Sequence, residues 1–352
     1  MLETTVMKHL LLTTIAAVLL VGCETTSWAS DPSPAVVTQL KEEVPKLLAE
    51  HDVPGLSMIL IRNGNIVWSH AFGNRRSDRN TPLTERTVFE AASMSKPLFA
   101  YAALKLMEQG KLDLDRSLDS YLPEPYLPDQ PNAAKITARM VLTHTTGFPN
   151  WRFGKPLTLR SQPGSKFSYS GEGFVYLQRV IKHLMVKDLD RWMKNRLLSP
   201  LDMDRSSYVW QKRLADDFAG GHNKAGKFKE GRRMYRKANA AYTLYTTPGD
   251  YGKFLLEMIR PDHERLHTLE PTMFREMLTD QPVPGNYGLG WALSGGFVSH
   301  SGANVTGFHC YSRFHKTRGD GLVIMTNGDN GAAVWKAVVE IIDVAGDVPD
   351  DK

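Results

Sequence analysis

The chain has 352 residues, of which 42% are hydrophobic, so it is long and apolar enough for a large core in one to three domains. Its formal net charge is +5, and part of that excess is local, because residues 222–237 hold seven lysines and arginines against one glutamate. Cys23 and Cys310 are the two cysteines, and the sequence has no metal-ligand spacing, phosphate-binding loop or internal repeat, so we expect no metal or nucleotide cofactor.

The N-terminal segment has the pattern of an export signal. Residues 10–21 are apolar apart from two threonines, follow Lys8 and end at Gly22-Cys23. A run of about a dozen apolar residues suits the core of a signal peptide and is too short to cross a bilayer as a helix. We therefore expect an exported protein, and export argues against a nucleic-acid partner.

Two cleavage sites are compatible with this segment. Leu20–Cys23 resembles a bacterial lipobox, in which the cysteine is lipidated and becomes the new N-terminus. This interpretation predicts a lipoprotein signal peptide at 1–22, a lipid anchor on Cys23, a tether at 23–33 and a location on the periplasmic side of a membrane. The alternative is an ordinary signal peptide cut near residues 29–30, which would leave a soluble periplasmic protein.

The folded part begins with a predicted helix at 34–51 and a predicted hairpin. Strands at 56–62 and 66–71 flank Asn63-Gly64, which is a strong signal for a two-residue turn between antiparallel strands. The first strands of the sheet are therefore expected close to the start of the domain.

The segment Ser93-Met94-Ser95-Lys96 brings a hydroxyl within one helical turn of an amine. Residues three apart lie on the same face of a helix, and Pro97 with the apolar spacing from 98 to 107 predicts a helix that starts here. A desolvated lysine with a lowered pKa helps to remove the proton of a serine hydroxyl. Ser93 is thus the candidate nucleophile, and Lys96 is the candidate base.

The remaining elements complete an α+β pattern. Apolar periodicity predicts helices at 174–185, 189–198, 250–259 and 332–344, and strands at 297–301, 306–314 and 321–326. The expected architecture is three-layered, with an antiparallel sheet from both chain ends flanked by helices. It forms one domain at 34–346 with a mostly helical insertion at approximately 75–285, and the active site lies in the cleft between the two parts.

Two later segments accompany Ser93-x-x-Lys96, namely Tyr169-Ser170-Gly171 and His300-Ser301-Gly302-Ala303. In this order the three segments resemble the motifs of penicillin-recognising serine enzymes, which are Ser-x-x-Lys, Tyr-x-Asn and Lys-Thr-Gly or a His-x-Gly variant. The likeness is greatest to the branch that holds class C β-lactamases, DD-peptidases and family VIII carboxylesterases, and it runs from about residue 53 to about residue 343. It implies a β-lactamase/transpeptidase-like fold.

The resemblance also implies roles for the motif residues. Ser93 would form an acyl-enzyme, and the backbone N–H groups of Ser93 and Ala303, the latter on an edge strand, would form the oxyanion hole. Tyr169, as phenol or as phenolate beside Lys96, would move the proton to the leaving group. His300 would complete the network and, if protonated, favour a substrate carboxylate. Ser301, Gly302 and Gly171 would line the substrate site.

The chain departs from the family pattern at two positions. Gly171 stands where asparagine is usual, and His300 stands where lysine is usual. Without the carboxamide, an amide side chain of the substrate loses a hydrogen bond worth roughly 1 kcal/mol. We therefore expect short-chain p-nitrophenyl esters to be hydrolysed at least about tenfold faster, in kcat/KM, than penicillins.

The leading functional prediction is an exported, membrane-anchored serine hydrolase that cleaves an ester or amide of a small-molecule or peptide-like acyl substrate. The alternatives are a slow-turnover penicillin-binding or wall-peptide-sensing protein, similar to a DD-carboxypeptidase, and a true β-lactamase. The basic segment 222–237 is interpreted as a solvated loop, with contact to anionic lipid headgroups or wall polymer as the alternative. His144 and Cys310 are interpreted as structural residues.

Overall fold

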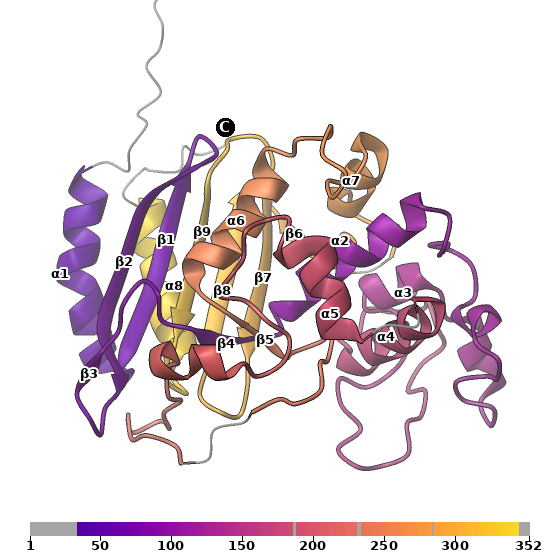
Figure 1. Ribbon diagram of the computed structural model, residues 1–352, viewed down its shortest axis with the longest axis horizontal. Coiled ribbons are helices and arrows are strands. Elements are labelled where there is room, and N and C mark those ends of the chain that lie inside the picture. The colour runs from indigo at the N-terminus through magenta and orange to yellow at the C-terminus, as the bar shows by residue number, and fades with distance from the viewer. Residues whose placement is uncertain (1–33, 186–187, 231–233, 284, 345–352) are drawn as a thin grey trace, which may run out of the picture.

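The computed structural model describes residues 34–185, 188–230, 234–283 and 285–344, and the predicted signal peptide, Cys23 and the tether lie outside them. Figure 1 shows an antiparallel sheet between layers of helices, with a helical region beside it. This is the α+β architecture expected from the sequence.

The sheet is built from both ends of the described chain. Its strand order is β3-β2-β1-β9-β8-β7-β6, and all neighbours are antiparallel. The strands are β1 (Gly55–Arg62), β2 (Asn65–Arg76), β3 (Thr81–Pro82), β6 (Ala292–Ser294), β7 (Phe297–Ala303), β8 (His309–His315) and β9 (Gly321–Thr326). The pairing of β1 with β9 joins the N-terminal hairpin to the C-terminal strands, and Asn63 and Gly64 have the positive φ values, 51° and 67°, that a tight hairpin turn requires.

One face of the sheet is covered by α1 (Pro34–Glu50) and α8 (Gly331–Val344). Buried residues recur every four positions on both helices, at Val36, Leu40 and Val44 of α1 and at Val334, Val338 and Ile342 of α8. Alternation along β1 sends Met58 and Leu60 into this cluster and Ile59 and Ile61 into the cluster on the opposite face. The two chain ends therefore close one layer of the core.

The opposite face is covered by α6 (Pro248–Ile259), which lies in front of the sheet in Figure 1. Thr247 caps this helix, since its side chain accepts a hydrogen bond from the N–H of Asp250. A Cβ on Gly252 would come within 2.2 Å of Ile59 Cδ1, so this glycine allows α6 to approach β1 closely. The predicted insertion is thus not a separate body, because its α6 forms the third layer of the fold.

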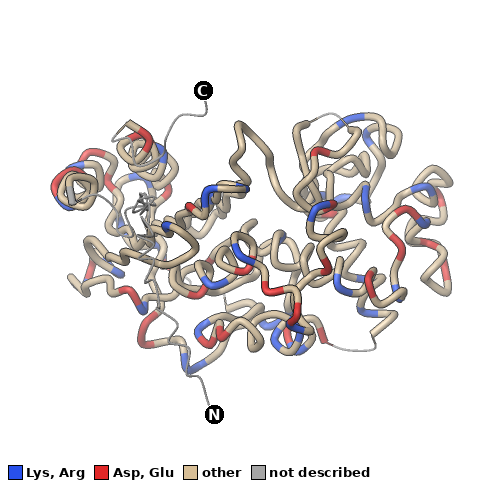
Figure 2. The backbone as a smooth tube through the Cα atoms, turned by 90° about the horizontal axis from the view of Figure 1, so that it is seen from above, with Lys and Arg blue, Asp and Glu red and all other residues tan. Residues whose placement is uncertain are grey.

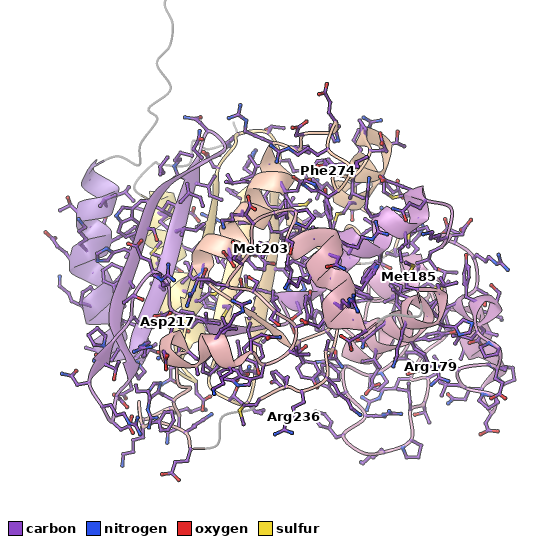
Figure 3. The ribbon with its side chains drawn as sticks, in the orientation of Figure 1. Arg179, Met185, Met203, Asp217, Arg236 and Phe274 are labelled. Atoms are coloured by element: carbon purple, nitrogen blue, oxygen red, sulfur yellow. The ribbon has the colours of Figure 1, made fainter. Side chains whose placement is uncertain are left out.

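The rest of the inserted region is mostly helical and carries a small two-stranded sheet. The helices are α2 (Ser95–Glu108), α3 (Ala138–Leu142), α4 (Gly171–Met185), α5 (Leu189–Met193) and α7 (Pro271–Leu278), with single turns η1 (Leu118–Tyr121), η2 (Pro131–Lys135), η3 (Lys194–Leu198) and η4 (Lys212–Asp217), and the strands are β4 (Phe89–Ala92) and β5 (Leu244–Thr246). The helix predicted at 189–198 is present over this range, with an α-helical first half, α5, and a π-helical second half, η3. Met203, labelled in Figure 3, belongs to the buried cluster that joins this region to the sheet.

Charged residues of both signs are interspersed along the described chain (Figure 2). The described part of 222–237 is a loop, as expected, and Arg236 projects from it into solvent (Figure 3). Lys229 is an exception within this loop, because its Nζ lies 2.7 Å from Asp329 Oδ1 and is ion-paired. None of the helices in the described ranges has the length and apolar character needed to cross a membrane.

Candidate active site

Ser93 lies in a tight turn between β4 and α2, two residues before the first residue of the helix. The preceding Ala92 has φ 48°, a left-handed conformation that is costly for a residue with a Cβ atom. Ser95 holds this turn in place, since its Oγ donates to Ala92 O at 2.6 Å and accepts from Leu244 N at 3.0 Å. The helix begins slightly later than the sequence predicted, and the nucleophile precedes its first turn.

Lys96 is fully buried beside Ser93. Its Nζ lies 3.2 Å from Ser93 Oγ and 2.9 Å from the carbonyl oxygen of Ala241. Desolvation by burial lowers the pKa of Lys96 to about 7. A large fraction of this amine is therefore uncharged at neutral pH and available to accept the Ser93 proton.

Tyr169 is half-buried, and its hydroxyl is buried close to Ser93 and Lys96. Lys96 Nζ lies 4.7 Å from the centre of the Tyr169 ring. Burial raises the pKa of the Tyr169 phenol, and the nearby Ser93 hydroxyl opposes this rise in part without making a full hydrogen bond to the phenol oxygen. The environment favours a neutral phenol rather than the phenolate that was one of the two forms expected.

His300 is buried on β7, with its ring centre 6.2 Å from that of Tyr169. Its Nδ1 lies 2.7 Å from the carbonyl oxygen of Ser301, which can only accept, so Nδ1 carries the proton. Burial, and then the charge of Lys96, lower the pKa of His300 to about 3. His300 is therefore neutral at physiological pH and offers no positive charge to a substrate carboxylate.

His144 packs against the turn that carries Tyr169. It is buried, its Nδ1 accepts a hydrogen bond from Ser170 N at 3.0 Å, and its ring centre lies 4.1 Å from that of Tyr169. Burial lowers the pKa of His144 well below its ordinary value. These contacts agree with the structural role interpreted from the sequence, and Cys310 is likewise buried.

The end of β7 runs beside the nucleophile turn. A Cβ on Gly302 would come within 2.1 Å of Ala91 O and 3.3 Å of Met94 N, so only glycine permits this approach. Asn304 N donates to Phe308 O across the β7–β8 ladder, and backbone alternation therefore turns the Ala303 N–H away from β8. β7 is not itself an edge strand, but β6 pairs only with its first half, so the half at 300–303 has an open edge.

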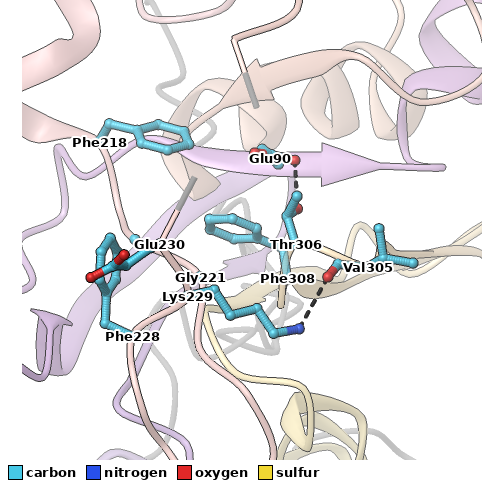
Figure 4. Close-up of a pocket in the computed structure, with 10 residues that line it drawn as sticks. Glu90, Phe218, Gly221, Phe228, Lys229, Glu230, Val305, Thr306 and Phe308 are labelled. Atoms are coloured by element: carbon cyan, nitrogen blue, oxygen red, sulfur yellow. Dashed lines mark hydrogen bonds between the residues drawn. The ribbon is translucent and has the colours of Figure 1, made fainter. Parts of the chain in front are cut away.

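Glu90 was not identified from the sequence, yet it anchors the turn that follows Ala303. This buried carboxylate of β4 lies three residues before Ser93, and its Oε2 is 2.7 Å from Asn304 Nδ2 and 2.8 Å from Thr306 Oγ1. Figure 4 shows Glu90 and Thr306 at a cavity of about 200 Å³, where Lys229 also donates to the carbonyl oxygen of Val305. Glu90 thus ties the turn after Ala303 to the strand that carries the nucleophile.

Gly171, at the N-terminus of α4, has no space for a side chain. A Cβ there would lie 2.3 Å from Cη2 of Trp151, whose ring also packs against Tyr242 at a centroid distance of 5.2 Å. The indole therefore fills the volume that an asparagine at position 171 would need.

A cavity of about 480 Å³ brings the predicted site residues together. Its lining includes Ser93, Tyr169, His300, Ser301, Ala303, Asn150, Tyr287, Tyr311 and Trp335. Lys96 lies buried behind Ser93, and Gly302 packs against the nucleophile turn. Asn150 was missed by sequence reasoning, because nothing in its local pattern links it to a segment about twenty residues further on. Within the described ranges, no cluster of three or more His, Cys, Asp or Glu side chains is arranged to hold a metal ion.

Known proteins share this fold. The D-alanine carboxypeptidase AmpC from Burkholderia cenocepacia superposes with a TM-score of 0.76 at 20% identity, covering 89% of this chain and 100% of that chain. A penicillin-binding protein homologue from Pyrococcus abyssi, described as octameric, has a TM-score of 0.72 at 22% identity, covering 88% and 77%. At these identities the likeness establishes the fold alone.

Sequence comparison extends the relationship. Protein Flp of Staphylococcus aureus strain N315 is 22% identical over 323 residues, covering 82% of this chain and 63% of Flp, so the chain spans less than two thirds of that relative. PbpX of Bacillus subtilis strain 168 is 25% identical over 312 residues, covering 83% of this chain and 75% of PbpX. The β-lactamase family model matches residues 40–345, which is well over half of the sequence. The chain therefore belongs to the β-lactamase family, a family of serine hydrolases.

Proposed function

We propose that this protein hydrolyses an ester or amide through an acyl-enzyme on Ser93, and that it prefers substrates whose leaving group carries no carboxylate. The observation that carries the proposal is the 3.2 Å contact between Ser93 Oγ and the buried Lys96 amine, whose pKa of about 7 suits a general base at neutral pH.

The reaction follows from these groups. Ser93 Oγ attacks the carbonyl carbon as Lys96 accepts its proton, and the N–H groups of Ser93 and Ala303 bind the oxyanion. The bond to the leaving group then breaks. Tyr169 donates its phenolic proton to the leaving group and regains a proton from Lys96. Water cleaves the acyl-enzyme by the reverse proton route, which releases the acid and restores Ser93.

His300 supports the preference for a leaving group that carries no carboxylate. With a pKa of about 3, this histidine gives no electrostatic attraction to the carboxylate of a penicillin or of a D-Ala-D-Ala peptide. We therefore keep the expectation that short-chain p-nitrophenyl esters exceed penicillins by at least about tenfold in kcat/KM. Export and lipidation at Cys23 are part of the same proposal and rest on the sequence pattern described above.

The test is intact-mass detection of an adduct on Ser93, run beside hydrolysis of a p-nitrophenyl ester, a cephalosporin and a D-Ala-D-Ala peptide. We expect turnover of the ester and a Ser93 adduct that decays. A stable β-lactam adduct with no ester turnover would instead favour a slow penicillin-binding or wall-peptide-sensing protein. Efficient penicillin turnover with esters ignored would identify a β-lactamase.

A further inference from the structure

The cavity of the nucleophile continues past the open edge of β7 onto the outer face of the sheet. Ser301 pairs directly with Tyr311 of β8, so the two side chains share a face, and Tyr311 packs against the cluster that α8 covers. Backbone alternation places His300 and Gly302 on the opposite face, where Gly302 meets the nucleophile turn. Because His300 and Tyr311 both line the cavity, it passes around the half of β7 that β6 leaves unpaired.

The outer groove, which is the part of this cavity lined by Ser299, Ser301, Tyr311 and Trp335, combines hydroxyl groups with an aromatic pair. The rings of Tyr311 and Trp335 are stacked, with their centres 4.4 Å apart and their planes at 4°, and both residues are half-buried. The described residues that line the whole cavity include no lysine, arginine, aspartate or glutamate. Since the negative face of an aromatic ring attracts weakly positive hydrogens, this lining matches an uncharged molecule with both hydroxyl groups and C–H faces.

His300 adds a hydrogen-bond acceptor next to the outer groove. Its Nδ1 carries the proton, because this atom faces the carbonyl oxygen of Ser301 at 2.7 Å, so Nε2 can only accept. Nε2 is buried and has no hydrogen-bond partner among the described residues, and the residue as a whole is 5% exposed. A buried acceptor without a donor is unfavourable, so a substrate hydroxyl that donates to Nε2 gains from pairing with it.

The outer groove lies on the leaving-group side of the site. In the proposed reaction the N–H groups of Ser93 and Ala303 bind the oxyanion, and Tyr169 protonates the leaving group. The ring of Tyr169 lies 6.2 Å from that of His300, which precedes Ala303 on β7, so the leaving atom lies toward His300. A group attached to that atom therefore continues past His300 into the outer groove.

We infer that the outer groove binds the leaving group of the substrate and that the preferred leaving group is an uncharged hydroxylated ring, such as a sugar. One ring hydroxyl donates to His300 Nε2, and a C–H face of the ring packs against the pair of Tyr311 and Trp335. The substrates are then acyl esters of carbohydrates, and hydrolysis releases a carboxylic acid and the sugar, whose hydroxyl regains its proton from Tyr169. This inference rests on the proposed function, because it presumes acylation of Ser93.

Two acetate esters of primary alcohols test the inference. Methyl 6-O-acetyl-glucopyranoside carries ring hydroxyl groups, whereas cyclohexylmethyl acetate has a ring of the same size without them. The readout is the ratio of their kcat/KM values, from acetate release, in the wild type, His300→Phe and Trp335→Leu. Because both esters acylate Ser93 through the same groups, comparing this ratio between variants cancels changes in the chemical step.

The two substitutions separate the acceptor from the aromatic face. His300→Phe keeps a ring and removes the acceptor, and Trp335→Leu keeps an apolar contact and removes the indole. Trp68→Leu is the matched control, because Trp68 is a half-buried tryptophan that packs against the same cluster as Trp335 and is not among the residues that line the cavity. Melting temperatures of the two tryptophan variants show whether they are equally folded.

The wild type is expected to favour the sugar ester at least about fivefold in kcat/KM. This ratio should fall about fivefold in His300→Phe, as for the loss of one neutral hydrogen bond, and about threefold in Trp335→Leu, and it should keep its wild-type value in Trp68→Leu. A wild-type ratio below about twofold, or a ratio that neither substitution lowers, would overturn the inference, and hydrolysis of p-nitrophenyl acetate with a Ser93 adduct would then leave the proposed function standing. Absence of that adduct and of p-nitrophenyl acetate turnover would overturn the proposed function and this inference with it.

Discussion

At the scale of single residues, burial sets the chemistry of the site. Desolvation lowers the pKa of Lys96 to about 7 and that of His300 to about 3, so both are largely neutral in mildly alkaline solution. Lysine in this state is a base, and histidine in this state is only a hydrogen-bonding group. The sequence predicted Lys96 as the base and left the charge of His300 open, and the low pKa of His300 means that it is not a fixed anchor for anions.

The lowered pKa of Lys96 predicts the pH profile of acylation. Below about pH 7 the amine is protonated and cannot accept the Ser93 proton, so kcat/KM for a neutral ester should rise with pH and level off near pH 8. Lys96→Met should remove this rise together with at least about 99% of the activity. Initial rates with p-nitrophenyl acetate between pH 5 and 9 measure the profile. A profile that is flat, or that declines from pH 6 upwards, would contradict Lys96 as the base.

Substitution of the two serines of the motif should have different effects on activity and on stability. Ser93→Ala is expected to abolish hydrolysis and labelling by a fluorophosphonate while the protein stays folded, because the change removes one hydroxyl whose hydrogen bond among the described residues is the one with Lys96. Ser95→Ala should still be labelled, but it leaves Ala92 O and Leu244 N without their partner and should cost about 1–3 kcal/mol of stability. Labelling and thermal denaturation of both variants measure this. Full labelling of Ser93→Ala would end the assignment of the nucleophile.

Trp151 occupies the space that a side chain at position 171 would need. An asparagine there would carry the carboxamide of the family pattern, but its Cβ would meet the indole at 2.3 Å. Gly171→Asn should therefore destabilise the protein by about 1–3 kcal/mol and leave the preference for esters over penicillins unchanged. Combining it with Trp151→Ala should recover stability relative to the single variant. The melting temperatures of both variants, with the two kcat/KM values, measure the effect.

At the scale of elements, the site depends on the distance between the β4 turn and the end of β7. Gly302 permits the close approach, and Glu90 holds the turn after Ala303 through Asn304 and Thr306. The proposed oxyanion hole therefore combines the turn after β4 with the end of β7, which belong to different sheets, so no single element determines it.

Gly302→Ala tests this spacing. The new Cβ would meet a backbone oxygen at 2.1 Å, so β7 must move away from Ser93, and kcat should fall at least about tenfold with a smaller change in KM. Gly249→Ala is the control, because the nearest atom to its Cβ lies at 3.8 Å and the residue is helical. Steady-state kinetics on both variants provide the comparison. Equal activity of Gly302→Ala and wild type would exclude a role of this strand in binding the oxyanion.

At the scale of the whole molecule, one sheet formed from both ends of the described chain lies beside the candidate active site, whose lining comes mainly from the inserted region and from β7. The proposed attachment to a membrane rests on Cys23, which lies outside the described ranges. The anchor and the catalytic domain should therefore be separable.

Cys23→Ser is expected to move the protein from the membrane fraction into the soluble periplasmic fraction, because the acylated thiol is lost. The purified domain should keep its wild-type activity, since Cys23 is not among the residues that line the candidate site. Fractionation with immunoblotting measures the distribution. A wild-type protein that is already soluble, with its N-terminus near Asp31, would show that the lipobox interpretation is wrong.

The sequence by itself determined the elements and the motif chemistry. The Asn63-Gly64 turn, the four-residue spacing on α1 and α8, and the one-turn separation of Ser93 and Lys96 are local patterns, and the structure contains each of them. The fold class followed from their order and from the three-motif resemblance.

Only the tertiary structure decided the protonation state of the motif residues and the space around them. Lys96 donates to Ala241, 145 residues away, and its burial, which sets its pKa, comes from packing between distant segments. Asn150 at Gly171, Glu90 at Asn304 and Trp151 over Gly171 are contacts of the same kind. Local periodicity reports on residues a few positions apart, whereas desolvation and steric exclusion depend on which remote segments meet.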